Sequence, residues 1–502
     1  MKGLNSYTIY GIFMGCEPDQ WARDWLEEQR KAGNTGLTVE KKGGVHYLKW
    51  ATTVWDKEAK KRRKVSEYRG VLNPDGTVTP PRPMRSRVDI TDVRDSGSAR
   101  LLAKAAEKIA EPLKKAFPND HREIVELVFA RCLGRGELNK CGRCWNRLED
   151  VLDLRPNTSP KSLSQTLERV GAARGSQDLF FNNIATEDGE MAVDMSVIFS
   201  KARGAFMNKS GYNRFGLSCP QFNLLAVCGL ASGRPQYMRV VPGNIKEGSA
   251  VSMLDEFDIP EGTVLVMDRG YHDRKLLDAI REKDLDYIVA VKRNSKVYDV
   301  TGTKDGIFRW RDSAVAYGRS RLGEEEWAYR FENLDSRNDE LVDALKARER
   351  DPDRELKIDK AGNFVIIASM EADPKEIYRL YKARSEIENF FDAGKNVLSA
   401  DRTYMHDDNH VMGHLFITFV AMLVRFEIAK LLDDADLSGS MTPEDVLDVY
   451  GTMKIMEGNA DMRQVVPKDV RDLDAKLGLF MYSTRDDRDR LDGIKKNRGR
   501  KP

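Results

Sequence analysis

The stretch MAVDMSVIF (191–199) decides the fold of the largest part of this chain. Bulky apolar residues such as Met191 and Val193 occupy every second position, and the positions between them hold mostly small residues and Asp194. This period of two predicts a β-strand whose bulky face is buried. Asp194 is then directed from the other face toward a cleft.

Strand and helix patterns continue outward from this segment and predict an open α/β sheet. TVLVM is a short apolar strand that ends at Asp268, and Asp273 is placed to cap the helix after it. The turn ASGRP (231–235) predicts a hairpin between its flanking strands. Further strands are predicted at 221–230, 236–241, 263–267 and 286–292, with helices near 247–257 and over 273–283.

The pattern is interrupted at 294–361 by a polar, charge-rich stretch and then resumes. IFRWR and EEWAYRF within it predict short strands, and NDELVDALKARER predicts an exposed helix. NFVIIAS (363–369) is the next core strand. A helix then begins with three agreeing signals: Asp373 as N-cap, Pro374 at the first helical position, and Glu376 to complete a capping box.

That helix leads into YKARSEIENFFDAGK (381–395), where four polar side chains share one side. On one continuous helix, Tyr381, Arg384, Glu388 and Lys395 fall within an arc of about 60°. The neighbouring arc carries an apolar set that would pack on a core. That set is Ile387, Phe390 and Phe391.

Three carboxylates on separate elements predict a metal site. The carboxyl end of a strand in an α/β sheet is where ligand groups gather. Asp194, Asp268 and Glu388 could therefore converge at one sheet edge. Clustered carboxylates repel unless cations neutralise them, and Mg²⁺ or Mn²⁺ prefers oxygen ligands. Two such ions suit in-line phosphoryl transfer.

Simpler interpretations remain open for each of these residues. A single Asp at a strand end is more often a helix cap or a solvated group, and an Arg–Glu pair four residues apart usually supports a surface helix. Asp392 lies near the same side of the helix and is an alternative to Glu388.

The spacing Tyr381-x2-Arg384-x3-Glu388-x6-Lys395 resembles the signature of the DDE transposases of insertion sequences known as the Tyr-Arg-Glu-Lys group. VLVMDRGYHD (264–273) and AVDMSVIFS (192–200) resemble the segments around that family's second and first aspartates. PQFNLLAVCGLASGRPQYMRVVPGN (220–244) and HLFITFVAML (414–423) extend the likeness, which covers roughly residues 160–430.

The resemblance implies an RNase H-like catalytic core with a β-rich insertion between the second aspartate and the glutamate. It also implies that Asp194, Asp268 and Glu388 are the catalytic, metal-binding triad for Mg²⁺ or Mn²⁺. The activity implied is hydrolysis at the ends of the element, followed by transesterification that joins a 3′-hydroxyl to target DNA. Tyr381, Arg384 and Lys395 would contact DNA near the cut, with Arg269 as a weaker candidate.

The N-terminal third contains a strongly basic segment. The whole chain has a net charge of +2, but residues 41–70 hold ten Lys or Arg against three acids. Lys60, Lys61, Arg62 and Arg63 lie in this segment near Trp50 and Trp55, which predicts a β-containing DNA-binding region at the terminal inverted repeats. A solvated β-turn is the simpler alternative.

The cysteine content and the longest apolar run bear on where the protein works. Six scattered cysteines fit a reducing compartment, and the ten-residue apolar run LFITFVAMLV (415–424) is too short to span a bilayer. We expect no membrane partner and a prokaryotic, cytoplasmic, nucleoid-associated protein. We also expect a homodimer that pairs two element ends. The organisation expected is 1–95 basic and DNA-binding, 96–185 helical, 186–293 core, 294–361 insertion, 362–435 core, and 436–502 helical with a basic tail.

Two clusters of potential zinc ligands compete with simpler explanations. Cys132, Cys141 and Cys144, with His121 as a fourth ligand, would make a structural site, against ordinary buried or free thiols. His406, His410 and His414 recur every four residues, a spacing that can bind a metal but equally serves capping, DNA contact or core packing.

Two alternatives to a transposase also remain. One is a catalytically inactive or domesticated DNA-binding protein derived from such an element. The other is a nuclease on the same fold.

Overall fold

The computed structural model divides the chain into two compact units, Met1–Asp89 and Ile90–Pro502. Each unit is described by itself. The structure describes residues 17–56, 60–81, 90–200, 202, 204–213, 216–217, 219–246, 249, 251–300, 305–351, 361–392, 394, 402–403, 405, 407–458 and 463–488.

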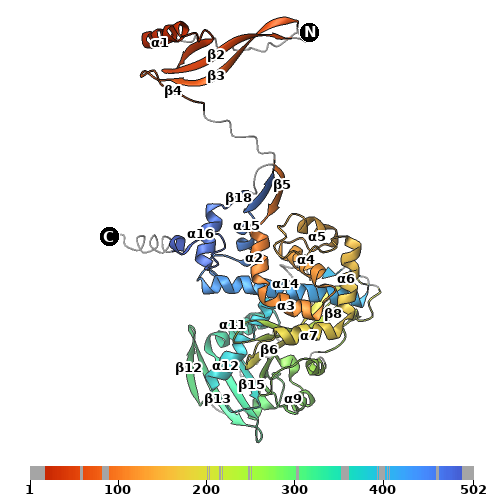
Figure 1. The fold of residues 1–502 in the computed structure, drawn as a ribbon. Helices are drawn as coiled ribbons and strands as arrows, with labels where there is room; N and C mark the ends of the chain where they lie inside the picture. The colour runs from red at the N-terminus through yellow and green to blue at the C-terminus, as the bar shows by residue number, and fades with distance from the viewer. Residues whose placement is uncertain are drawn as a thin grey trace, which may run out of the picture. The chain divides into compact units, whose positions relative to one another are not determined.

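The first unit is a helix with a four-stranded antiparallel sheet (Figure 1). The strands follow one another in space in chain order, and a small core containing Ala22, Leu26, Leu48 and Leu72 lies between sheet and helix. The two central strands have twelve residues each and are much longer than their neighbours. The elements are α1 Gln20–Lys31, β1 Leu37–Lys42, β2 Val45–Asp56, β3 Lys61–Leu72 and β4 Val78–Thr79.

The second unit is built on a mixed eleven-stranded sheet, which confirms the predicted α/β class. Along one path the strands are ordered β12-β13-β14-β15-β11-β10-β6-β8-β7, with β9 beside β8 and β16 beside β6. β6, β10 and β11 are parallel, whereas β8 and β15 run antiparallel to their neighbours. The core strands are β6 Glu190–Ser200, β7 Lys209–Ser210, β8 Pro220–Gly229, β9 Pro235–Pro242, β10 Val264–Met267, β11 Asp286–Ala290, β15 Asn363–Ala368 and β16 Arg402–Thr403.

The polar insertion contributes strands to this same sheet, because β14 pairs with β15 over six residues of register. The two predicted strands and the exposed helix are present, and no residue of that helix is buried. The middle strand was not predicted, since its sequence AVAYGRSR loses its apolar alternation halfway. The elements are β12 Gly306–Trp310, β13 Ser313–Arg321, β14 Trp327–Asn333 and α11 Leu334–Arg350.

Helices cover the other end of the core around one long central helix, α14, Asp408–Asp434 (Figure 1). The apolar run predicted to be a buried helix lies inside it, and residues 411 and 413–424 are buried. No helix among the described residues has the length and apolar character needed to cross a membrane. Before the sheet lie α2 Gly97–Ala105, α3 Glu107–Ala116, α4 His121–Cys132, α5 Leu138–Trp145, α6 Pro160–Ala172 and α7 Arg174–Ile184.

The remaining elements complete the second unit. β5 and the C-terminal strands β17 and β18 form a separate three-stranded sheet. The segment expected to be helical near 247–257 contains a short 3-10 helix, η1, Val251–Glu256, and residues 247, 248 and 250 of it lie outside the described residues. The other elements are β5 Ile90–Asp95, η2 Arg269–Tyr271, α9 Arg274–Arg281, α10 Val297–Val300, α15 Pro443–Tyr450, β17 Lys454–Gly458, β18 Arg463–Val465 and α16 Lys468–Leu477.

The central helix is held against α6 by two glycines. A Cβ on Gly413 would lie 2.0 Å from the carbonyl oxygen of Leu167, and one on Gly171 would lie 1.8 Å from that of Asn409. Both obstacles are backbone atoms in helices, so neither can yield without moving a helix. Small residues therefore set the close approach of α6 and α14.

We expect Gly413→Ala to lower the free energy of unfolding by roughly 3 kcal/mol, because the added methyl must push two helices apart. Thermal unfolding of the full chain measures this. Gly175→Ala in α7 is the matched control: nothing lies within 4 Å of its Cβ position, so this change should be neutral or stabilising. Equal stability of the two variants would contradict the close packing.

Candidate active site

Two of the predicted carboxylates leave neighbouring parallel strands at the same level. Val193 of β6 is in register with Met267 of β10, so Asp194 and Asp268 are the next residues on adjacent strands. Local backbone bonds orient both side chains. Asp194 Oδ1 accepts the Met195 N–H at 2.8 Å, and Asp268 Oδ1 accepts the Arg269 N–H at 2.7 Å.

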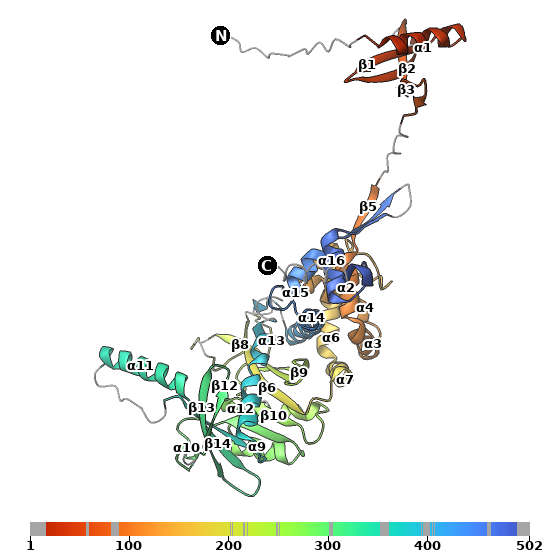
Figure 2. The same cartoon turned by 90° about the vertical axis from the view of Figure 1, so that its left-hand side faces the viewer.

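The third carboxylate arrives on a pair of short helices that lie over these strands (Figure 2). α12, Pro374–Ala383, packs on β10 and β11, and α13, Glu386–Asp392, packs on β6 and β8. Two of the three signals predicted for the start of α12 are confirmed: Asp373 accepts hydrogen bonds from the N–H groups of Lys375 and Glu376, and Pro374 is the first helical residue. Glu376 pairs with Arg379 at the helix surface.

The prediction of one continuous helix through residues 381–395 is wrong. The chain turns at residues 384–385, between α12 and α13. Ser385 donates its hydroxyl to the Lys382 carbonyl at 2.9 Å, and its N–H bonds the same carbonyl at 3.2 Å. A serine hydroxyl that competes for a backbone acceptor in this way favours a helix end. Tyr381 therefore belongs to α12 and Glu388 to α13.

The turn places Arg384 between two of the predicted metal ligands. Its Nη1 lies 3.4 Å from Asp194 Oδ2, and its Nη2 lies 3.8 Å from Glu388 Oε1. Burial by itself would lower the pKa of Arg384, but the nearby carboxylates, Asp194 first, outweigh this effect and raise that pKa above its usual value. The guanidinium thus stays charged and neutralises the cluster.

Tyr381 makes the corresponding contact to the other aspartate. Its hydroxyl donates a long hydrogen bond of 3.4 Å to Asp268 Oδ1. Burial, followed by the charge of Asp268, raises the pKa of Tyr381 to about 12, so the phenol remains protonated and able to donate. The Arg384 guanidinium also lies 5.7 Å from the Tyr381 ring centroid. Tyr381 and Arg384 therefore link all three carboxylates.

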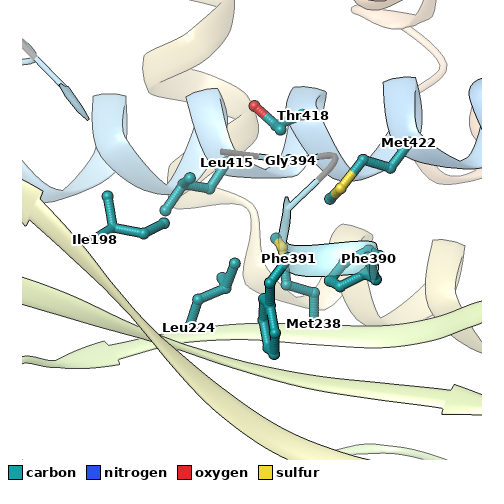
Figure 3. Close-up of a pocket in the computed structure, with 9 residues that line it drawn as sticks. All are labelled: Ile198, Leu224, Met238, Phe390, Phe391, Gly394, Leu415, Thr418 and Met422. Carbon is teal, nitrogen blue, oxygen red and sulfur yellow. The ribbon is translucent and has the colours of Figure 1, made fainter. Parts of the chain in front are cut away.

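The apolar side of α13 anchors it, as the sequence predicted. Ile387, Phe390 and Phe391 are all buried. Figure 3 shows the two phenylalanines facing α14 and the sheet across a small cavity of about 10 Å³. Glu388, next to this apolar side, is 63% exposed, against 19% for Asp194. Glu388 thus lies at the open rim of the site, where a macromolecular substrate has access.

The three side chains supply only oxygen ligands, which matches the preference of Mg²⁺ and Mn²⁺. In the described part of the chain, however, no three His, Cys, Asp or Glu side chains lie near enough to share one metal ion. Arg384 lies between Asp194 and Glu388 instead. The donor set therefore fits the ion in chemistry, and bringing Glu388 into the same coordination sphere requires Arg384 to leave its present place.

Of the other residues predicted to contact DNA, some lie near the three carboxylates and others lie in the first unit. Arg269 begins η2, directly after Asp268. Lys60, Lys61, Arg62 and Arg63 lie in the first unit, exposed at the β2–β3 turn. Lys395 lies outside the described residues. Asp392, the alternative to Glu388, is an exposed residue at the end of α13.

One group of basic residues near the site was not predicted, because its members have no regular spacing in the sequence. A cavity of about 540 Å³ opens beside the loop that follows Asp268. Its lysines come from three separate segments, so no local pattern could bring them all together. Its basic lining residues are Lys246, Lys275, Lys283, Lys292 and His272.

The cysteines proposed as zinc ligands are engaged otherwise. Cys132 donates to the Ala421 carbonyl, Cys141 to the Arg135 and Glu137 carbonyls, and His121 Nδ1 lies 3.0 Å from the Pro118 carbonyl. Burial raises the pKa of Cys132 and Cys141 to about 12 and that of Cys144 to about 11. These thiols are protonated at neutral pH, and in the part of the chain that the structure describes no three His, Cys, Asp or Glu side chains are grouped to hold a metal ion, so the alternative of ordinary buried thiols describes them.

The two described histidines of the His406, His410 and His414 series have different roles, one at a helix cap and one in the core. His410 lies 2.7 Å from Asp407, the N-cap of α14. His414 is buried against Arg131, which also donates to Thr418 at 2.8 Å. His406 lies outside the described residues. Capping and core packing, both weighed from sequence, are the roles that the described histidines have.

Comparison with known proteins gives the class of this part of the chain. Residues 192–424 match the family model described as the transposase DDE domain. The matched segment begins two residues before Asp194, includes Asp268 and Glu388, and ends within α14. This part of the chain is thus similar to the transposase DDE domain.

A solved structure of piggyBac transposase, a synaptic complex with hairpin DNA, is also similar. It is 10% identical in sequence with a TM-score of 0.40, covering 82% of this chain and 87% of that one. No curated protein matches the chain.

Proposed function

We propose that this protein is the transposase of an insertion sequence, which cuts the ends of its own element and joins them to target DNA with Mg²⁺ or Mn²⁺. The observation that carries the proposal is the linking of Asp194, Asp268 and Glu388 through Tyr381 and Arg384. Arg384 and Asp194 are 190 positions apart in sequence, and Tyr381 and Asp268 are 113 apart, yet each pair is in contact.

The strand arrangement supports the RNase H-like core that the resemblance implies. β9, β8 and β6 form an antiparallel meander, and β10 and β11 continue parallel to β6. Asp194 lies on the first of these strands in chain order, and Asp268 directly follows the fourth. The two aspartates are therefore held by adjacent hydrogen-bonded strands.

The residues have separate roles in this proposal. Asp194, Asp268 and Glu388 would hold the metal ions, which supply activation of the attacking hydroxyl and stabilisation of the leaving oxygen. Arg384 neutralises the carboxylates and, once displaced from between them, binds a phosphate of the DNA. Tyr381 and Lys395 would contact DNA beside the cut, and Arg269 begins the loop next to it.

DNA is the partner at two further places. The exposed cations Lys60, Lys61, Arg62 and Arg63 would bind the terminal inverted repeats, and the lysine-lined cavity beside the Asp268 loop would take phosphates of the same or the target duplex. A homodimer would pair two element ends. The setting we propose is the prokaryotic cytoplasm, on the nucleoid.

The test supplies pre-cut duplexes, taken from the DNA flanking the gene, together with a target plasmid and Mg²⁺. We expect joined products, which EDTA abolishes. Hydrolysis without joining would identify a nuclease on the same fold, and neither product would identify a DNA-binding protein that has lost catalysis. Inverted repeats bracketing the gene would support the insertion-sequence origin.

A further inference from the structure

The two long strands of the first unit continue well beyond the rest of their sheet. β1 pairs with β2 only up to Trp50, and β4 pairs with β3 only at Val71 and Leu72. β2 and β3 stay paired with each other out to Asp56 and Lys61. Ala51–Asp56 and Lys61–Ser66 therefore form a two-stranded ribbon, called the ribbon below, with no third strand on either edge among the described residues.

The dimensions of the ribbon match the major groove of B-DNA. Six residues at about 3.3 Å each give a projection of roughly 20 Å. The major groove is about 12 Å wide and about 8.5 Å deep, and it admits a two-stranded β-ribbon. The ribbon is thus long enough to reach the groove floor while the rest of the sheet stays outside the sugar-phosphate backbone.

The strand register divides its cations between two faces. Trp55 is opposite Arg62 and Thr53 is opposite Lys64, so these four side chains share one face. On the other face Val54 is opposite Arg63. Each face therefore presents an arginine at the far end of the ribbon next to an apolar side chain. Arginine can bind guanine O6 and N7, and apolar groups can contact the thymine methyl.

The exposure of these side chains argues against a purely structural role. Trp55 is 57% exposed and Val54 is 50% exposed. Polar residues at these two positions would keep the surface as soluble, so the exposed apolar side chains need another explanation. The five consecutive cations from Lys60 to Lys64 are exposed, and none forms an ion pair with another described residue. Five exposed cations, with the exposed apolar Val54 and Trp55 opposite them on the partner strand, complement a polyanion whose base edges are partly apolar.

We propose that the ribbon enters the major groove of duplex DNA and reads base edges there, with Arg62 and Arg63 as the reading side chains and the lysines on the flanking phosphates. This deepens the proposed function, because it states how the protein recognises the ends of its element. It rests on the proposed function only for the statement that the DNA bound is an element end. Recognition of bases by the ribbon requires no metal ion.

The test uses the full chain in EDTA, with duplexes from the DNA flanking its gene and, in parallel, selection from a random-sequence duplex pool. We expect protection of guanine N7 from methylation at a few positions of the bound site. Arg62→Gln or Arg63→Gln should each remove protection at one or two of these guanines and weaken specific binding about tenfold or more. Neutralising Lys60, Lys61 and Lys64 should instead weaken all sequences alike and reduce the salt slope by about one per residue.

The matched control is Arg30→Gln with Lys31→Gln, two exposed cations on α1 of the same unit, which should leave N7 protection unchanged. The proposal is overturned by absence of sequence-selected binding, by protection confined to the minor groove, by preference for single strands, or by ribbon variants that bind as the parent does. A chain that joins ends while its ribbon variants bind normally would overturn this inference alone. A chain that shows the N7 pattern but joins no ends would overturn the proposed catalysis alone.

Discussion

Glu388→Gln is expected to reduce DNA cleavage by at least about a thousandfold, equivalent to roughly 4 kcal/mol of transition-state stabilisation. Glutamine keeps the size of the side chain but removes the charge that a divalent ion requires. The parent side chain is 63% exposed and its 3.8 Å pair with Arg384 is solvent-screened, so the substitution should leave the thermal midpoint nearly unchanged. Cleavage of labelled element ends, together with binding in EDTA, measures the two effects separately.

Asp392→Asn is the matched control, because Asp392 is an exposed acid on the same short helix, one turn beyond Glu388. It should cleave at close to the parent rate. If Asp392→Asn lost cleavage and Glu388→Gln did not, the metal-binding acid would lie one turn later. If both variants cleaved normally, α13 would contribute no ligand at all.

Glu126→Gln is expected to stabilise the helical part of the second unit at alkaline pH by roughly 4 kcal/mol. Glu126 lies in α4 with no exposed surface, and neither carboxyl oxygen has a hydrogen-bond partner among the described residues. Burial, with a smaller contribution from Glu123, raises the pKa of Glu126 to about 8. The protein therefore keeps a buried acid in its neutral form.

The sign of the pH dependence follows from this raised pKa. The unfolded chain releases the Glu126 proton near pH 4.5, whereas the folded protein holds it until about pH 8. The stability contribution is therefore fully present below pH 4.5, is lost as the pH rises to about 8, and changes little above it. Glutamine has no proton to lose, so the variant lacks this decline.

Calorimetric unfolding at pH 5, 7 and 9 measures this effect as the difference between variant and parent midpoints. We expect that difference to be small at pH 5 and to grow toward pH 9. Glu111→Gln, an exposed acid on the neighbouring α3, should show no such growth. A parent and a Glu126→Gln variant with parallel pH profiles would mean that the carboxylate is solvated in the native state.

The elements that were predicted well depend on neighbours within a few residues. Alternation in MAVDMSVIF identified β6, and Asp273 and Asp373 were recognised as caps because a side chain that bonds the next backbone N–H groups is a short-range feature. The end of α12 at Ser385 depends equally on nearby residues, yet the sequence analysis did not predict it. The Ser385 hydroxyl can donate to solvent or to the Lys382 carbonyl, and residue spacing does not show which of these acceptors it has.

Short-range sequence patterns were thus enough to predict most core strands, the helix starts and the exposed insertion helix, and to single out the candidate carboxylates. Hydrophobic periodicity and helix capping both depend on residues that are close together in the chain. The approach of those carboxylates to Tyr381 and Arg384 came from packing. The parallel register of β6 and β10 brings Asp194 and Asp268 level, and Arg384 reaches Asp194 across 190 positions of sequence. Such contacts depend on which strands pair and on where α13 lies against α14, and no pattern confined to one segment carries that information.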